Sequence, residues 1–424
     1  MLASLGASSA LAVDLRFTGF ATIGYAISDQ DFRYLRYIDN DGTFKADSLA
    51  GVQAEAQFDP KWGATLQLVA SAPRTRDDGY EAKVRWAFVS FRPDNDWLIR
   101  AGRLRPPFFI NTQNAEVGVT YDQARLPQEV YSLSPVYDFD GGAITKTWLL
   151  GESELALDGY WGQTDLRYRF PQRDAPVANF RRFDVTSKGL VFSRSTDSLY
   201  LRGGFHRVNI QPGDARPAFV VPSARAGEPP IVPTQQLIDT FVPLSIPGPS
   251  PFGGTLYLPG NSVSEVVMNV IVLSADWHAG DWRVTGEYGQ RSIKNNVLAP
   301  GSKGLYATVA RRVGKWTPYW THARLRSDSD LLNLYEAVNG APVPLLAQLS
   351  PPFFPANFHR VEADAIAVYD QYSNMLGVSF AFSATSKLKF EWMRTHVGLT
   401  SSLVDGDVHN KSFNVFSVSY SVAF

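Results

Sequence analysis

Residues 13–28 read VDLRFTGFATIGYAIS, and their side chains alternate in character over the whole stretch. The odd positions are apolar or small, whereas the even positions include Asp14, Arg16 and Thr22. Successive side chains of a β-strand point to opposite faces, so this period of two predicts one long strand with an apolar and a polar face.

The same alternation recurs along the chain and predicts sixteen strands, while stretches with a helical period are scarce. The strands are expected near residues 13–28, 47–58, 63–71, 79–91, 97–103, 140–149, 153–162, 185–194, 199–209, 264–278, 282–293, 304–313, 316–326, 370–384, 388–397 and 412–424. In the fourth, Trp86 and Phe88 are assigned to the apolar face opposite Lys83 and Arg85. The pattern is weakest in 140–149 and in 264–278, which is apolar on both faces.

The connections between these strands alternate between short turns and long loops. The long connections include residues 104–139, 210–263 and 327–369, and the second of these is rich in proline. Short turns at one end and long loops at the other are typical of a transmembrane antiparallel β-barrel. We therefore expect a single barrel domain over 13–424, with short periplasmic turns, long extracellular loops and both termini on the periplasmic side.

Tryptophan gives an independent indication of the same orientation. Five tryptophans lie at or beside the predicted tight turns: Trp62, Trp97, Trp277, Trp282 and Trp316. Indole prefers the headgroup layer of a membrane, so such a ring predicts an aromatic girdle at the short-turn rim. The alternative is ordinary core tryptophan next to hairpin turns.

Composition excludes several classes of protein. The chain has 424 residues, of which 45% are hydrophobic and 19% charged, with 40 basic residues, 41 acidic residues and no cysteine. A near-zero net charge argues against nucleic-acid binding, and the lack of cysteine excludes disulfides and cysteine-based zinc sites. The histidines show no metal-ligating spacing, and no nucleophile-elbow or phosphate-loop motif is present. We expect no catalytic residue, metal or cofactor.

The first twelve residues, MLASLGASSALA, end in an A-x-A pattern after a short apolar stretch. This pattern predicts a signal peptide over 1–12 and hence export. The basic segment that usually opens such peptides is absent, so we expect the true start of the signal to lie upstream. The alternative is an apolar terminus without a targeting role.

If the apolar faces meet lipid, the other faces line a lumen, and sixteen strands enclose enough space for an aqueous channel. The predicted lining is more basic than acidic and includes Arg100, Arg324 and Arg326. A charged lining selects ions by sign, so weak anion preference follows as a hypothesis. The alternative is that these residues pair with one another or with loop carboxylates.

The segment after the fifth strand carries a specific resemblance. It runs from Arg100-Ala-Gly-Arg103 to Glu129-Val-Tyr131 and resembles the Gram-negative outer-membrane porins whose third loop folds into the barrel. The matching positions are Gly102, Arg103, Pro106, Val117, Gly118, Tyr121, Arg125, Pro127, Glu129, Val130 and Tyr131, together with the terminal Phe424. The resemblance implies that loop 104–139 narrows the barrel at mid-height, and that the protein forms a homotrimer.

It also implies a constriction at which basic wall residues face charged loop residues. The wall set is Lys83, Arg85, Arg100, Arg103 and Arg105, and the loop set is Glu116, Asp122, Arg125 and Glu129. Counting from the turn at 92–96 places residue 85 roughly opposite 103. Arg100 and Arg103 have opposite parity, and a bulge at Gly102 would bring both inward.

These observations favour an outer-membrane porin that passes small hydrophilic solutes without catalysis, surrounded by lipid and lipopolysaccharide. One alternative is a substrate-selective anion channel, for phosphate or organic acids, that uses Lys83, Arg85, Arg100 and Arg103. Another is a barrel enzyme or adhesin that acts through loops 210–263 and 327–369.

Overall fold

The structure is a computed structural model that describes residues 13–171, 173, 178–213, 237–238, 240–260, 262–299 and 301–424. The predicted signal peptide and much of the proline-rich loop 210–263 lie outside the described residues. No helix in the described part of the chain is both long and apolar enough to cross a membrane.

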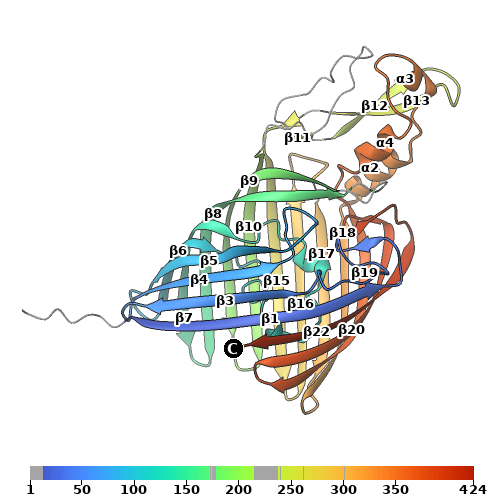
Figure 1. The fold of residues 1–424 in the computed structure, drawn as a ribbon. Coiled ribbons are helices and arrows are strands. Elements are labelled where there is room, and N and C mark those ends of the chain that lie inside the picture. Colours follow the sequence, from blue (N-terminus) through green and yellow to red (C-terminus); the bar gives the residue numbers. More distant parts are fainter. Residues whose placement is uncertain are drawn as a thin grey trace, which may run out of the picture.

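Sixteen antiparallel strands of the described chain close into one barrel, as the alternation predicted (Figure 1). In chain order they are β1 (Asp14–Ser28), β3 (Leu49–Gln57), β4 (Trp62–Ser71), β5 (Glu81–Phe91), β6 (Trp97–Leu104), β7 (Phe139–Leu150), β8 (Ser153–Pro171), β9 (Ala178–Ser195), β10 (Leu199–Pro212), β15 (Val266–Ala279), β16 (Trp282–Ile293), β17 (Ser302–Arg311), β18 (Trp316–Ser327), β19 (Tyr369–Ser383), β20 (Ser386–Ser401) and β22 (Lys411–Ala423). Each strand pairs with its neighbours in this order, and β1 pairs with β22 to close the sheet. The predicted fold class is confirmed.

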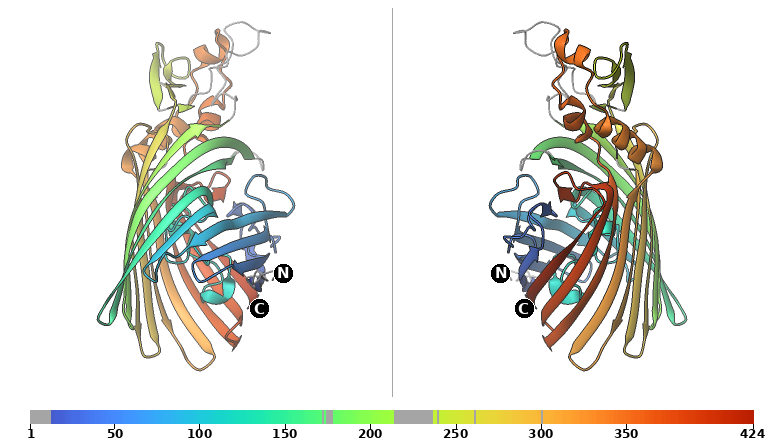
Figure 2. Two further views of the ribbon diagram at one scale, coloured as in Figure 1. Left: turned by 90° about the vertical axis from the view of Figure 1, so that its left-hand side faces the viewer. Right: turned by 90° about the vertical axis from the view of Figure 1, so that its right-hand side faces the viewer.

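One end of the barrel consists of short turns, and both ends of the described chain lie toward it (Figure 2). Gly151, Gly280 and Gly314 take positive φ values of 59°, 57° and 61° in three of these turns, where a side chain would strain the backbone. The rim carries exposed tryptophans, including Trp282 at 46% and Trp316 at 47%. These positions agree with the predicted aromatic girdle.

The opposite end carries the long loops, which fold into small elements of their own (Figure 1). These are the paired strands β2 (Arg33–Tyr34) and β21 (Val404–Asp405), β11 (Leu237–Ile238) and β14 (Ser262–Val263), and β12 (Phe241–Ile246) and β13 (Gly254–Pro259), with helices α2 (Ser329–Gly340), α3 (Leu345–Leu349) and α4 (Phe358–Ala363). The β12–β13 hairpin and the helices project above the barrel and share buried apolar clusters.

The alternation along each barrel strand separates an outer from an inner face. In β22, Phe416 and Tyr420 on the outer face are 53% and 41% exposed, whereas Ser419 and Ser421 on the inner face are almost completely buried. The exposed apolar side chains of the other strands form a band around the barrel, which is the surface that an outer-membrane barrel presents to lipid.

A β-bulge in β5 changes this alternation. The pairing of β5 with β4 shifts between Gln67 and Leu68, so that Arg85 has no partner in the ladder. Beyond the bulge, Trp86 lies opposite Gln67 and Phe88 opposite Thr65, on the inner face of the sheet. The prediction that these two aromatic side chains face lipid is therefore wrong, because an inserted residue reverses the parity of every later position.

Candidate functional site

The connection between β6 and β7 lies inside the barrel (Figure 2). It contains a short 3-10 helix, η1 (Gly118–Thr120), and a helical turn, α1 (Gln128–Tyr131). Helix η1 contacts β1 and β22, whereas α1 contacts β16, β17 and β18. The loop thus reaches several parts of the inner wall that are far from β6 and β7 in the sheet.

Four cations of the wall and loops surround two carboxylates of this connection. We call this group the basic cluster; it consists of Arg74, Lys83, Arg85 and Arg105 around Glu116 and Asp138. One carboxylate oxygen of Glu116 lies 3.1 Å from Arg85 Nε, and the other lies 2.5 Å from Arg105 Nη2. Asp138 lies 3.4 Å from Arg85 Nη1 and 3.6 Å from Lys83 Nζ.

Burial and charge determine the protonation of the loop groups in this cluster. Burial opposes the ionisation of Glu116, but Arg105, Arg85 and Arg74 hold the pKa of its carboxyl below the usual range. Burial lowers the pKa of Arg74 to about 10, and its guanidinium lies 3.3 Å from the centre of the Tyr137 ring. Arg85 is only 2% exposed, whereas the Lys83 side chain is 37% exposed. Lys83 is therefore the wall cation that water reaches.

Against β10 and β15, away from the basic cluster, the loop packs by apolar contacts. Phe108, Phe109 and Leu133 belong to one buried cluster with inward side chains of β10 and β15, such as Val208 and Val270. This contact explains why residues 264–278 are apolar on both faces: one face meets lipid and the other meets the loop. A Cβ at Gly289 or Gly304 would collide with Leu133 or with the loop backbone.

Charged residues fasten the middle of the loop to β19 and β20. Asp122 accepts hydrogen bonds from Ser379 at 2.8 Å and from Lys387 at 2.9 Å. Lys387 and Ser379 hold the pKa of Asp122 low, against the opposing effect of its burial. Lys389 Nζ donates to the carbonyls of Gly118 and Gln123 at 2.6 and 2.9 Å.

The remaining predicted loop residues are also anchored. Arg125 forms a two-pronged ion pair with Asp47 of the first long loop, with N–O distances of 2.5 and 2.8 Å. Glu129 is completely buried and accepts hydrogen bonds from Gln371 at 2.9 Å and from Ser373. The predicted acidic loop residues thus hold the loop against separate parts of the wall instead of forming one row opposite the basic cluster.

One buried wall carboxylate completes the attachment. Glu287 on β16 accepts hydrogen bonds from Ile110 N at 2.9 Å, Tyr131 Oη at 2.8 Å, Tyr306 Oη at 2.9 Å and Ser274 Oγ at 2.8 Å. Four donors converge on one carboxyl group, which satisfies this buried acid without a cation.

The extracellular ends of the strands carry a second ionic network. Arg169 in β8 binds Asp405 at 2.5 Å and Asp77 at 3.0 Å, and Asp77 also binds Arg36 at 2.8 Å. These four residues join the first, second and last long loops to the end of β8. The loops over the mouth are therefore linked to one another.

Two of the predicted wall residues, Arg100 and Arg103, do not join the basic cluster. Arg100 lies on the inner face of β6 opposite Ser90, and among the described residues no ion pair joins it to a carboxylate of the loop. Arg103 lies opposite Ala87, two residues from the predicted register, and pairs with Asp140 at 2.6 Å. No register shift occurs at Gly102, so Arg103 keeps the outward parity.

Arg324 and Arg326 lie on the opposite face of the barrel wall from the one predicted. They share the outer face of β18 with Trp316 and Trp320 and are exposed, while Ala323 and Leu325 on the inner face are completely buried. The prediction that the two arginines line the lumen is wrong, because here the inner face is the apolar one that packs inside the barrel.

Several residues of the site were missed: Asp138 lies in the loop itself, and the others lie in other loops or on strands distant in sequence. Asp138 and Arg74 complete the basic cluster, Asp47 binds Arg125, and Lys387 and Lys389 hold the middle of the loop. Charge pairing could be suspected from the sequence, but nothing in it specifies partners that are more than 70 residues apart, as with Arg125 and Asp47. Across the described residues, no group of three or more His, Asp or Glu side chains is placed to hold a metal ion.

Comparisons with known proteins agree with the barrel. No family model and no curated protein matches the sequence. Among solved structures, the chain is similar to a loop-deletion mutant of OmpT, an outer membrane protein of Vibrio cholerae (TM-score 0.53, 13% identity, covering 97% of this chain and 100% of that one). It is also similar to OprB of Pseudomonas putida (0.50, 10%, 97% and 94%) and to the outer membrane channel DcaP of Acinetobacter baumannii (0.50, 9%, 99% and 99%).

The chain therefore has the fold of integral outer-membrane β-barrels of the porin and channel type. At these identities the similarity concerns the fold.

Proposed function

We propose that this protein is an outer-membrane porin through which small hydrophilic solutes and ions diffuse passively. One observation carries the proposal: a loop is fastened inside a sixteen-stranded barrel by charged and polar contacts, and a wall cation beside it, Lys83, remains accessible to water. Barrels of this size enclose an aqueous channel. A fixed loop inside such a barrel would narrow the channel.

We also propose a weak preference for anions. The basic cluster contains four cations, Arg74, Lys83, Arg85 and Arg105, against the two carboxylates Glu116 and Asp138, which leaves two positive charges in excess. Arg85 is neutralised between two carboxylates. The selectivity is therefore expected to depend mainly on the exposed Lys83, because a charged lining attracts ions of the opposite sign.

A substrate-selective anion channel has less support. That alternative needs Lys83, Arg85, Arg100 and Arg103 to act together, and only the first two share a site. We further propose, on the resemblance in loop 104–139, that the barrel assembles as a homotrimer, which native mass spectrometry of the detergent-extracted protein would test.

The conductance of the purified protein in a planar bilayer tests the main proposal. We expect stepwise channel openings and, in a potassium chloride gradient, a reversal potential shifted toward that of chloride. The Lys83→Ala variant should lose most of that shift, whereas Arg324→Ala, which removes a cation from the outer face, should retain it. Insertion without conductance would refute the channel, and a cation preference in the wild type would refute the anion selectivity.

A further inference from the structure

The outer face of β17 to β20 carries a concentration of cationic and imidazole side chains near the extracellular end. We call it the rim cluster; its members are Lys303, His322, Arg324, Arg326, Arg394 and His396. The strand register makes them neighbours. Lys303 lies opposite Arg326, and Asn374 on β19 lies opposite both His322 on β18 and Arg394 on β20. The lysine and the three arginines are exposed.

Few carboxylates compensate this charge. Arg326 pairs with Asp370 at 3.7 Å, and the two histidines contact neutral groups: His322 lies 3.0 Å from Asn374, and His396 lies 3.0 Å from Ser412. Among the residues that the structure describes, no carboxylate forms an ion pair with Lys303, Arg324 or Arg394. Three cations of the rim cluster thus face outward with no anionic partner in the described part of the chain.

The rim cluster begins where the apolar outer band ends. Along β18 the outward side chains are Trp316, Pro318 and Trp320 before His322 and the arginines. Charged residues are costly at the middle of a bilayer but cost little near its surface. This position therefore places the rim cluster at the headgroup layer of the outer leaflet.

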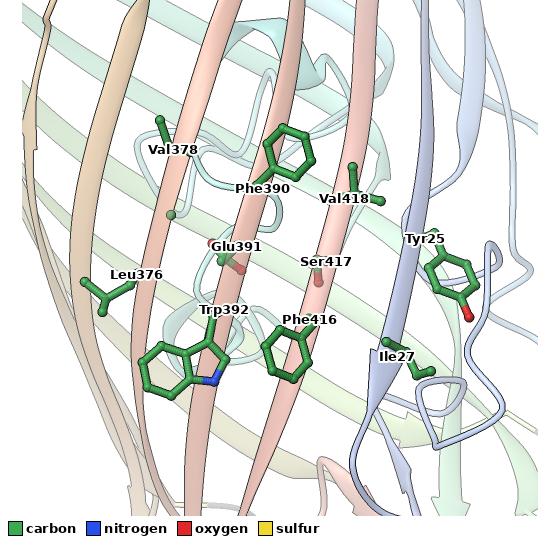
Figure 3. A pocket seen from close by; sticks show the side chains of 11 residues that line it. Tyr25, Ile27, Leu376, Val378, Phe390, Glu391, Trp392, Phe416, Ser417 and Val418 are labelled. Carbon is green, nitrogen blue, oxygen red and sulfur yellow. The ribbon is translucent and has the colours of Figure 1, made fainter.

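A hollow in the apolar wall (Figure 3) lies on the short-turn side of the rim cluster, because its lining residue Trp392 comes before Arg394 along β20. It has a volume of about 550 Å³ and crosses β19, β20, β22 and β1. Figure 3 shows Leu376, Phe390, Trp392 and Phe416 around it. Trp392 precedes Arg394 by two residues on the same strand, so one step of about 7 Å along the strand separates the hollow from the cluster.

We propose that the rim cluster and this hollow together bind one phosphorylated lipid of the outer leaflet. Guanidinium groups form strong, two-pronged hydrogen bonds with phosphate, and a juxtamembrane group of Lys and Arg attracts anionic headgroups. The hollow then takes part of an acyl chain against Phe390, Trp392 and Phe416. The inference rests on the outer-membrane fold and is independent of the proposed conduction, so either can fail alone.

The experiment is native mass spectrometry of the detergent-purified barrel, titrated with bisphosphorylated lipid A, with monophosphorylated lipid A and with phosphatidylcholine. We expect one molecule of bisphosphorylated lipid A to bind at a concentration at least tenfold below that needed for phosphatidylcholine, and the monophosphorylated form to lie between them. The Arg324→Gln/Arg394→Gln variant should weaken lipid A binding about tenfold.

The chain offers a matched control on the other side of the barrel. Lys188 and Arg207 are exposed, lie opposite each other on β9 and β10, and face outward beside Leu190 and Phe205. The Lys188→Gln/Arg207→Gln variant removes the same charge and should leave lipid A binding within about twofold of the wild type. An equal loss in both variants would show that only net charge matters and would overturn the proposal.

Two further results would also overturn it. Glucosamine 1,6-bisphosphate, which carries the phosphates without acyl chains, should not displace lipid A at equal concentration, and full displacement would show a simple anion site. The two arginines could instead contact a second copy of the chain. Dissociation of an oligomer in the Arg324→Gln/Arg394→Gln variant, with unchanged lipid A binding, would establish that use of the surface.

Discussion

Strands β5 and β18 place their charges on opposite faces of the same barrel. In β5, Lys83 and Arg85 point inward and meet the carboxylates of the loop between β6 and β7. In β18, Arg324 and Arg326 point outward, and Leu325 is buried inside. The difference shows that the inner face of a barrel strand is polar where water or polar groups of the loop meet it. Where a loop packs by apolar contacts, the inner face is apolar.

The largest effect is expected from removing a carboxylate of the basic cluster that faces β5. In the Glu116→Gln variant, Arg85 and Arg105 lose a buried partner, which typically costs about 3–5 kcal/mol. We expect a lower temperature for loss of the fast-migrating folded form on unboiled SDS gels, and noisier channel currents from a loosened loop. The control is Asp140→Asn, whose ion pair with Arg103 is half exposed and is worth about 1 kcal/mol or less. Equal effects of the two changes would contradict this account.

Substitutions of two adjacent residues of β18 test whether its inner face is the apolar, buried one. Leu325→Ala should destabilise the barrel by about 2–5 kcal/mol, because it removes a completely buried side chain. Arg324→Ala, one position earlier, should change the free energy of unfolding by about 0.5 kcal/mol or less. Denaturant unfolding in lipid vesicles, followed by tryptophan fluorescence, measures both. The reverse order of effects would mean that the faces of β18 are assigned wrongly.

Single cysteine variants can test which of positions 83 and 324 faces the channel, since the chain has no cysteine of its own. K83C and R324C should both react with a negatively charged methanethiosulfonate reagent. Only modification of K83C should reduce the chloride current, by roughly half, because the added charge and volume lie beside the channel. A similar reduction in modified R324C would place that position in the lumen.

The smallest expected effect concerns the helices above the barrel. Burial raises the pKa of Glu362 in α4 to about 7, with Arg181 acting in the opposite direction. The folded loop therefore retains a proton that the unfolded loop loses above the ordinary value of 4.5. The resulting stability is complete below pH 4.5 and is lost as the pH rises through 7. Hydrogen exchange of 329–366, corrected for intrinsic rates, should be faster at pH 8 than at pH 5.5, and Glu362→Gln should remove the difference.

The sequence was sufficient for the strands of the barrel but not for every face of them. A period of two locates a strand, and the alternation of turns and loops orients the barrel. The bulge at Arg85 leaves no mark in the alternation, so Trp86 and Phe88 were assigned to the wrong side. For Arg324, polarity alone could not distinguish the inner face of the barrel from its outer face.

The site was predictable only in part, because its contacts join distant segments. A loop inside the barrel was expected only from the resemblance, and Lys83, Arg85, Arg105 and Glu116 do lie together. Glu129 meets Ser373, 244 residues away, and nothing local specifies that partner. The helix α2 did have a local signal, since Leu331, Leu332, Tyr335 and Val338 have helical spacing and are all buried.

The seam between β1 and β22 has a consequence for how the chain reaches this structure. Thr22 and Ser421 share a hydrogen bond of 2.9 Å although 399 residues separate them. Every other pair of adjacent barrel strands is joined directly by a turn or a loop, but β1 and β22 must meet across almost the entire chain, which makes the closing step entropically demanding and slow. Until it occurs, two strand edges remain unpaired and prone to aggregation. Substitutions in β22 should therefore affect the yield of inserted protein more than the stability of barrels that have already closed.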